Sequence, residues 1–169
     1  MDLSIVIVNW NTRDLLRDCL ESVERHLCGV GAEVIVVDNA STDDSVDMVK
    51  RFFPRVHLIV NSENRGFAAA NNQGFEHASG KYVLLLNSDT LVHGDVLLRS
   101  MEYLDTNPEV GMMGCKVLNG DGSTQRTCSQ FPTFTYLLIL SLVANRLGGS
   151  FFSRYQMLHW ALDDAREVE

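Results

Sequence analysis

The chain has 169 residues, which is enough for one domain with a hydrophobic core. Its 46% hydrophobic and 21% charged residues exclude an intrinsically disordered chain. Its net charge of −8 argues against nonspecific binding to nucleic acid, which needs a basic face, but permits a phosphorylated ligand that a divalent cation screens.

The first half of the chain alternates short β-branched runs with longer amphipathic segments, as βαβ units around a parallel sheet do. In chain order we predict a strand at 3–8, a helix at 12–27, a strand at 34–37, a helix from Ser41 or Thr42 to Pro54, a strand at 56–60, a helix at 66–77, a strand at 82–86, a helix at 94–104 and a strand at 110–118. The predicted fold class is α/β.

The last part of the chain has a different pattern. Residues 134–147 are nearly all apolar, but this stretch is too short for a membrane span of roughly 20 residues. The tail, 163–169, is acidic. No basic segment precedes the first predicted strand, so we expect no signal peptide and a cytoplasmic location.

The cysteines are scattered and include no C-x-x-C pair: they are Cys19, Cys28, Cys115 and Cys128. We predict free thiols in a reducing cytoplasm. A zinc site that joins these thiols to His26 or His159 is the minor alternative.

Polar side chains follow each of the first four predicted strands, at residues 9–11, 38–39, 61–65 and 87–89. Ligands of parallel α/β sheets bind outside the carboxyl ends of the strands, so these segments predict a polar pocket. The alternative is ordinary turn and cap chemistry, for which Asn and Asp are also common.

Three side chains of these segments carry specific chemistry. Asp38 can accept hydrogen bonds from a nucleobase or a ribose, or can cap the helix that follows it. Arg65 can pair with a phosphate, or can be a solvated arginine beside Glu63. Asp89 suits a hard divalent cation, or is a turn residue. The chain has neither G-x-G-x-x-G after its first strand nor a P-loop.

The order and spacing of segments 4–11, 33–43, 61–67 and 84–90 resemble family 2 glycosyltransferases, and most closely the bacterial rhamnosyltransferase branch. Residues 111–126 are similar to that branch too. The resemblance implies a three-layer α/β/α GT-A fold around a Rossmann-like nucleotide-binding sheet. It also implies a nucleotide-sugar-binding core at 1–125 and, at 126–169, the helical and incomplete start of the acceptor-side region.

The resemblance also implies the roles of individual residues. The residues that would line the nucleotide site are Val8, Asn9, Trp10, Asp38, Asn39, Asn64, Arg65, Asn87 and Ser88. Asp89 would hold the metal ion, Mg²⁺ or Mn²⁺. Many family members have D-x-D there, whereas this chain has Asn87-Ser88-Asp89, so one carboxylate is missing and the metal is either held more weakly or held with the help of other ligands.

The activity that the resemblance implies is inverting transfer of a sugar from a nucleoside-diphosphate sugar to a saccharide or lipid-linked acceptor. Rhamnose is the sugar it favours, and other sugars stay open. The general base is expected beyond Glu169, so we expect this chain to be a truncated product that binds nucleotide with little or no turnover. A contact with the inner face of the bacterial membrane and a homodimer are further expectations.

Two other functions remain open from the residues. A sugar-nucleotide nucleotidyltransferase shares the α/β sheet and the ligand, but its Gly-rich, lysine-bearing loop is missing after Val8. A non-catalytic membrane-surface or interaction module is suggested by residues 134–147, although Arg146 is the one charge in that run.

Overall fold

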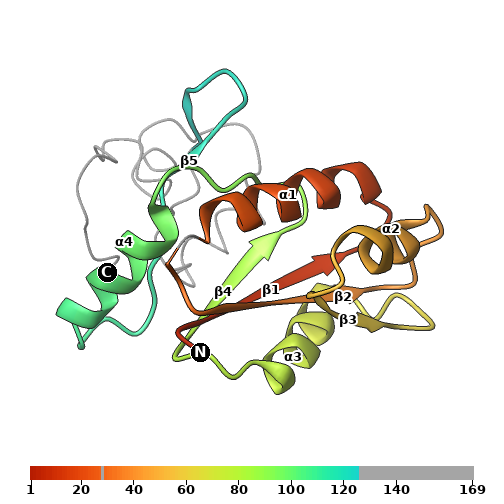
Figure 1. The fold of residues 1–169 in the computed structure, drawn as a ribbon, viewed down its shortest axis with the longest axis horizontal. Coiled ribbons are helices and arrows are strands. Elements are labelled where there is room, and N and C mark those ends of the chain that lie inside the picture. Colours follow the sequence, from red (N-terminus) through yellow and green to blue (C-terminus); the bar gives the residue numbers. More distant parts are fainter. Residues whose placement is uncertain (28, 126–169) are drawn as a thin grey trace, which may run out of the picture. The chain divides into compact units, whose positions relative to one another are not determined.

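The computed structural model describes residues 1–27 and 29–125, in which helices and strands alternate (Figure 1). The elements are β1 (Leu3–Asn9), α1 (Arg13–His26), β2 (Ala32–Asp38), α2 (Ser45–Phe52), β3 (His57–Val60), α3 (Phe67–His77), β4 (Tyr82–Asn87), α4 (Val96–Thr106), β5 (Val117–Leu118) and β6 (Thr124–Gln125). The chain divides into two compact units, Met1–Met113 and a unit that begins at Gly114. The predicted boundary at residue 125 stays a prediction.

The first unit contains a parallel four-stranded sheet with the strand order β3-β2-β1-β4. The register pairs Asn9 with Asp38, Val8 with Asn87, and Asp38 with Val60. Parallel strands in this register end at one edge of the sheet, so the polar segments that follow the four strands share that edge.

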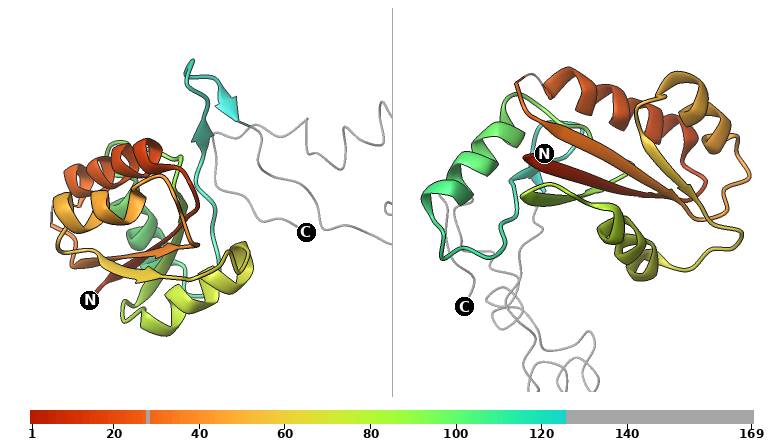
Figure 2. Two further views of the ribbon diagram at one scale, coloured as in Figure 1. Left: turned by 90° about the vertical axis from the view of Figure 1, so that its right-hand side faces the viewer. Right: turned by 60° about the horizontal axis from the view of Figure 1, so that its bottom comes forward.

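Helices cover both faces of the two central strands, β1 and β2. On one face, Ile5 and Ile7 belong to a core cluster that includes buried side chains of α1, α2 and α4. On the other face, Val6 and Ile35 pack with Ala70 of α3. Both views of Figure 2 show α3 on the opposite side of the sheet from α1 and α2. The predicted three-layer α/β/α arrangement is therefore confirmed, and burial on both faces explains the unbroken apolar sequences of β1 and β2.

The outer strand β4 is covered less completely than its apolar sequence suggests. Tyr82 and Leu84 are partly buried against the helix-rich core. Val83 and Leu85 point to the other face and are 45% and 48% exposed. Within the described residues β4 pairs with β1 alone, and α3 packs on β1 and β2.

The predicted elements are confirmed, with two corrections. α2 begins at Ser45, after a loop in which Asp44 has a left-handed backbone (φ 62°), so neither Ser41 nor Thr42 starts the helix. The strand predicted at 110–118 was wrong over 110–116, where the described chain is irregular. Its last two residues form β5, which pairs with β6 in a short hairpin.

Two of the four cysteines lie within the described residues, whereas the apolar stretch 134–147 does not. Cys19 is buried and Cys115 is exposed, and neither forms a disulfide within the described residues. Cys28, Cys128 and His159 lie outside the described residues, as do 134–147 and the acidic tail, 163–169. No helix in the described part of the chain is long and apolar enough to cross a membrane.

A close contact between α3 and β1 depends on Gly74. A Cβ atom on this residue would lie 2.3 Å from Cγ1 of Val6, which is fully buried. We expect Gly74→Ala to lower the free energy of unfolding by about 1–2 kcal/mol, because overpacking outweighs the gain in helix propensity. Urea unfolding measures this. A Cβ on Gly111 would meet no atom within 4 Å, so Gly111→Ala is the control, and equal midpoints for both variants would contradict the prediction.

Candidate functional site

The carboxyl ends of β1 and β2 are joined by a buried carboxylate. Asp38 is 1% exposed and Asn9 is 0% exposed. Oδ2 of Asp38 accepts a hydrogen bond from Nδ2 of Asn9 at 2.8 Å, and its Oδ1 accepts one from the backbone N–H of Ser41 at 2.9 Å. Nδ2 of Asn9 also donates to Oγ of Ser41 at 3.0 Å. The carboxylate therefore fixes the orientation of the Asn9 amide, since only its NH₂ group can donate.

This orientation is passed on to β4. With its NH₂ group directed at Asp38, Asn9 presents Oδ1 to the hydroxyl of Thr12, which donates to it at 2.7 Å. The Thr12 hydroxyl has one proton, so Ser88 must donate in the 2.9 Å contact between the two hydroxyls. A directed chain of hydrogen bonds thus links the ends of β2, β1 and β4 and leaves acceptor positions on Ser88 for a ligand.

The loops after β1 and β2 hold each other. The backbone N–H of Asn11 donates to Oγ of Ser41 at 2.9 Å, and Oδ1 of Asn11 accepts from the N–H of Thr42 at 2.8 Å. Asn11 and Ala40 both have left-handed backbones, with φ of 55° and 62°. Asn adopts this conformation readily, but it costs about 1 kcal/mol for alanine. The loop at Ala40 therefore stores strain that the neighbouring hydrogen bonds offset.

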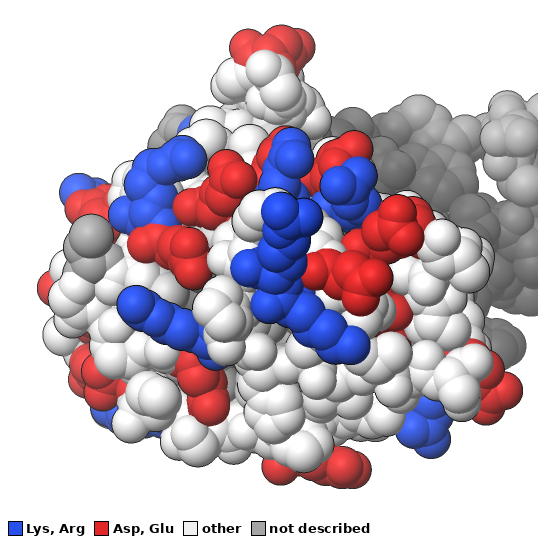
Figure 3. All heavy atoms as spheres, turned by 45° about the vertical axis from the view of Figure 1, so that its right-hand side comes forward, with Lys and Arg blue, Asp and Glu red and all other residues white. Residues whose placement is uncertain are grey.

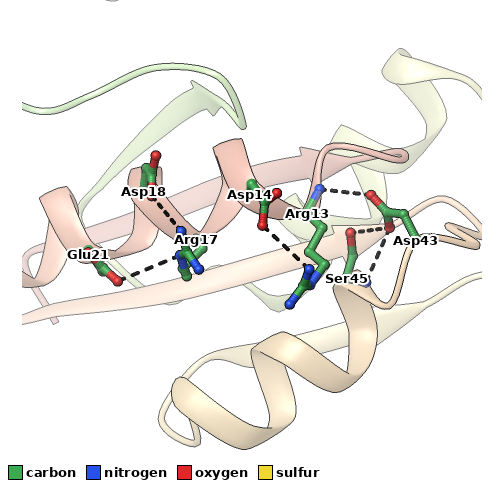
Figure 4. A network of polar contacts seen from close by, with 7 residues as sticks. All are labelled: Arg13, Asp14, Arg17, Asp18, Glu21, Asp43 and Ser45. Carbon is green, nitrogen blue, oxygen red and sulfur yellow. Dashed lines mark hydrogen bonds and ion pairs between the residues drawn. The ribbon is translucent and has the colours of Figure 1, made fainter.

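Asp43 joins the first turns of α1 and α2 (Figure 4). Its Oδ2 accepts from the N–H of Arg13 at 2.8 Å, and its Oδ1 accepts from Oγ of Ser45 at 2.5 Å and from the N–H of Ser45 at 3.2 Å. Burial raises the pKa of Asp43, but the hydrogen bonds from Ser45 and Arg13 outweigh it and hold the pKa below its ordinary value.

The surface of α1 carries ion pairs of Arg13 with Asp14 and of Arg17 with Asp18 and Glu21. All these side chains are at least 44% exposed, so each pair contributes little to stability. Figure 3 shows basic side chains among acidic ones on this side of the molecule.

Amide side chains order the loop after β3. Asn61 and Gln73 of α3 exchange two hydrogen bonds of 2.8 and 3.0 Å, and Nδ2 of Asn61 also donates to Oδ1 of Asn39 at 2.9 Å. Nδ2 of Asn39 donates to the carbonyl of Gly66 at 3.3 Å, and Oδ1 of Asn64 accepts from the N–H of Gly66 at 2.9 Å. The backbone on both sides of Arg65 is therefore held beside the end of β2.

The predicted site residues fall into two groups. The buried or half-buried group carries the hydrogen-bond network and consists of Val8, Asn9, Asp38, Asn39 and Ser88. The exposed group consists of Trp10, Asn64, Arg65, Asn87 and Asp89. Asn9 is hydrogen-bonded to Asp38 and to the backbone of Asn39, and Ser88 joins them through Thr12. Val8 takes part by packing alone. Arg65 makes no hydrogen bond or ion pair within residues 1–27 and 29–125, so the alternative pairing with Glu63 is not formed.

The sequence did not identify the partners that orient these residues: Thr12, Ser41 and Gln73. Thr12 was predicted as a helix start and Ser41 as an N-cap. The Thr12 hydroxyl makes no cap hydrogen bond, because it is used across the sheet edge. Ser41 lies before the start of α2 at Ser45, and its hydroxyl accepts from Asn9 instead. The position of Thr12 and Ser41 shortly after strand ends was the signal in the sequence that could have identified them as partners at this edge.

Asp89 is exposed and lies near Cys19 of α1. Burial first, and then the negative charge of Asp89, raise the pKa of Cys19 to about 12. No group of three or more His, Cys, Asp or Glu side chains in the described residues is arranged to hold a metal ion. One exposed carboxylate does fit a Mg²⁺ or Mn²⁺ ion that takes its other ligands from a diphosphate and water.

A sequence model of the family described as Glycosyl transferase family 2 matches residues 4–161. The succinoglycan biosynthesis protein ExoO of Rhizobium meliloti is 33% identical over 131 residues, which are 76% of this chain and 37% of that protein. The poly(ribitol-phosphate) beta-glucosyltransferase of Bacillus spizizenii is 33% identical over 128 residues, or 72% of this chain and 20% of that protein. The chain thus spans well under half the length of these relatives.

Two solved structures resemble the fold. S. aureus TarS matches 64% of this chain with a TM-score of 0.57 and 24% identity, and the match covers 20% of TarS. The mannosyltransferase PcManGT of Pyrobaculum calidifontis, solved in complex with GDP-Man and Mn²⁺, matches 60% of this chain and 32% of its own with a TM-score of 0.55 and 28% identity.

The buried carboxylate predicts the effect of an amide at its position. Asparagine has one acceptor oxygen, so in Asp38→Asn either Asn9 or the N–H of Ser41 loses its acceptor. We expect the free energy of unfolding to fall by about 1–3 kcal/mol, the cost of an unsatisfied buried donor. Chemical unfolding measures it. The exposed Asp47 allows a matched control, Asp47→Asn, which we expect to change stability by less than about 0.5 kcal/mol.

The hydrogen bonds to Asp43 predict a pH dependence of stability. Because its folded pKa lies below its unfolded value of about 4, this carboxylate stabilises the fold above pH ~4, and that contribution is lost as pH falls through the folded pKa. We expect Asp43→Asn to be less stable at pH 7 and to lose less stability on acidification. Ser45→Ala should shift stability in the same direction by less. If the free energy of unfolding of wild type and of Asp43→Asn fell equally as the pH was lowered, this assignment would be contradicted.

Proposed function

The chain belongs to glycosyl transferase family 2, and from this membership we propose that its described part binds the nucleoside-diphosphate sugar of an inverting glycosyltransferase. One observation carries the proposal: the polar ends of β1, β2 and β4 are joined by one directed hydrogen-bond network at the carboxyl edge of the sheet. This is the edge at which parallel α/β sheets bind nucleotides. The family match favours a transferase over a nucleotidyltransferase or an interaction module.

We assign the β1–β2 side of the edge to the nucleobase and ribose. Each oxygen of Asp38 accepts one hydrogen bond and keeps a second acceptor position, which suits an N–H group of a base. Because Asp38 is 1% exposed, this contact requires the loop at Ser41 to open slightly. Trp10 is 56% exposed beside this loop and offers an aromatic face to a base.

We assign the diphosphate to Arg65 and to a cation held by Asp89. The planar guanidinium of an exposed arginine without an acidic partner in the described chain is suited to phosphate oxygens. The cation would be Mg²⁺ or Mn²⁺ and would neutralise charge on the leaving diphosphate. The complex of PcManGT with GDP-Man and Mn²⁺ supports this pairing of ligand and ion.

The sugar and acceptor are assigned by chemical class. The named relatives are a succinoglycan biosynthesis protein and a poly(ribitol-phosphate) beta-glucosyltransferase, which supports a polyhydroxylated acceptor. Within that class we propose a saccharide or lipid-linked saccharide. We keep rhamnose as the proposed sugar, and the inner face of the bacterial membrane as the proposed location. The general base on the acceptor is not assigned to any described residue.

Calorimetric titration of the chain with UDP, dTDP and GDP, each with and without Mn²⁺, tests the proposal. We expect one nucleoside diphosphate to bind at a single site and more tightly with Mn²⁺ than without it. If none of the three binds under either condition, the proposed donor site is wrong for this chain.

The cation assignment predicts a selective loss in Asp89→Ala. We expect the gain in nucleotide affinity that Mn²⁺ provides to fall by about tenfold or more, because the carboxylate is the proposed protein ligand. Affinity without metal should stay within about twofold, since the base side is unchanged. Asp47→Ala, on the exposed side of α2, is the matched control. An unchanged Mn²⁺ effect in Asp89→Ala would remove Asp89 from the cation site.

A further inference from the structure

Helix α1 holds the segment after β4 at successive points. Near the helix start, the Thr12 hydroxyl contacts the Ser88 hydroxyl at 2.9 Å. One to two turns further on, the thiol of Cys19 donates to the carbonyl of Asn87 at 3.7 Å. The Ser22 hydroxyl then accepts from the backbone N–H of Val92 at 2.9 Å. Asp89 lies inside the segment that these contacts enclose.

Ser22 is an unusual residue for its position. It lies on the buried face of α1 among apolar side chains and is 4% exposed. Its hydroxyl donates to the carbonyl of Cys19 at 2.7 Å, so its oxygen is left to accept from Val92. Val92 is 5% exposed, and the Ser22 hydroxyl is the acceptor that the described structure gives its N–H.

The turn that presents Asp89 is therefore closed at both ends. The N–H of Thr90 donates to the carbonyl of Asn87 at 3.1 Å, which forms the turn itself. Ser22 then fixes the chain three residues after Asp89.

We propose that Ser22 is a positioning residue for the cation, acting through Val92 to hold the turn of Asp89. The inference rests on the proposed function. Where two carboxylates hold an ion, a small displacement of one carboxylate can be compensated by the other. Asn87-Ser88-Asp89 offers a single carboxylate. The affinity for the cation therefore depends on how firmly the backbone holds that carboxylate in position.

Ser22→Ala tests the inference, because it removes the acceptor and adds no volume. The gain in UDP, dTDP or GDP affinity on adding Mn²⁺ should fall by about tenfold, as is typical when the support of a metal ligand is removed. Affinity without metal should stay within about twofold, since Asn9 and Asp38 do not depend on this contact. Hydrogen exchange should become faster at residues 88–92 and stay unchanged at residues 38–42.

Ser100→Ala is the matched control. Ser100 lies in α4 and donates to the carbonyl of Val96 within its own helix, so the same chemical change is made away from the turn. We expect it to leave both the Mn²⁺ effect and the exchange at residues 88–92 as in wild type. Thermal unfolding of both variants shows whether either has lost its global fold.

The outcomes separate this inference from the proposed function. If wild type gains affinity with Mn²⁺ and Ser22→Ala gains as much, the positioning role is wrong while the donor site stands. An equal loss with and without metal would mean a general structural role and would also overturn the inference. Nucleotide binding by wild type with no Mn²⁺ effect would overturn it together with the cation site. Wild type that binds no nucleotide would overturn the proposed function and this inference together.

Discussion

The burial of one carboxylate is the constraint on which the site depends. Asp38 can be almost fully buried at the end of β2 because the Asn9 amide and the backbone of Ser41 both donate to it. Its acceptor-only chemistry then determines which way each polar group beyond it points. Asn9 must turn its oxygen toward Thr12, and Thr12 must accept from Ser88. One charge thus sets the donor and acceptor pattern across three strands of the sheet.

The two halves of the sheet edge are built differently, and the difference follows from their packing. On the β1–β2 side the polar groups are buried and satisfied, and even the strained backbone at Ala40 is kept in place by its neighbours. On the outer side, β4 pairs with β1 alone in the described residues, and the carboxylate of Asp89 is exposed. We propose this buried side for the base and ribose, which the loop at Ser41 must open slightly to admit. An open side suits a charged diphosphate whose cation keeps part of its water.

The sequence was sufficient for the elements of the first unit and for the edge at which polar residues gather. Apolar runs identify β1 and β2 because both strands are buried on two faces, and parallel strands necessarily bring their carboxyl ends to one edge. The sequence was insufficient for the contacts. The partners of Thr12 and Ser41 lie up to 76 residues away, and a hydroxyl before a helix looks the same whether it caps that helix or bonds across the sheet. The irregular chain at 110–116 was missed because an apolar run does not reveal whether a partner strand is available.

Helix α1 connects the two sides of the edge, and this explains why so much polar chemistry lies on one amphipathic helix. Its first turn is tied to the loop after β2 through Asp43, and its N-cap residue Thr12 contacts Ser88 after β4. Further along the helix, Cys19 and Ser22 hold the segment after β4. Asp43 acts on the β2 side of the edge, and Ser22 acts on the β4 side. A change confined to Ser22 alters the β4 side alone. The separation of these two effects follows from the geometry, because the contacts lie on different turns of a helix whose apolar face is fixed in the core.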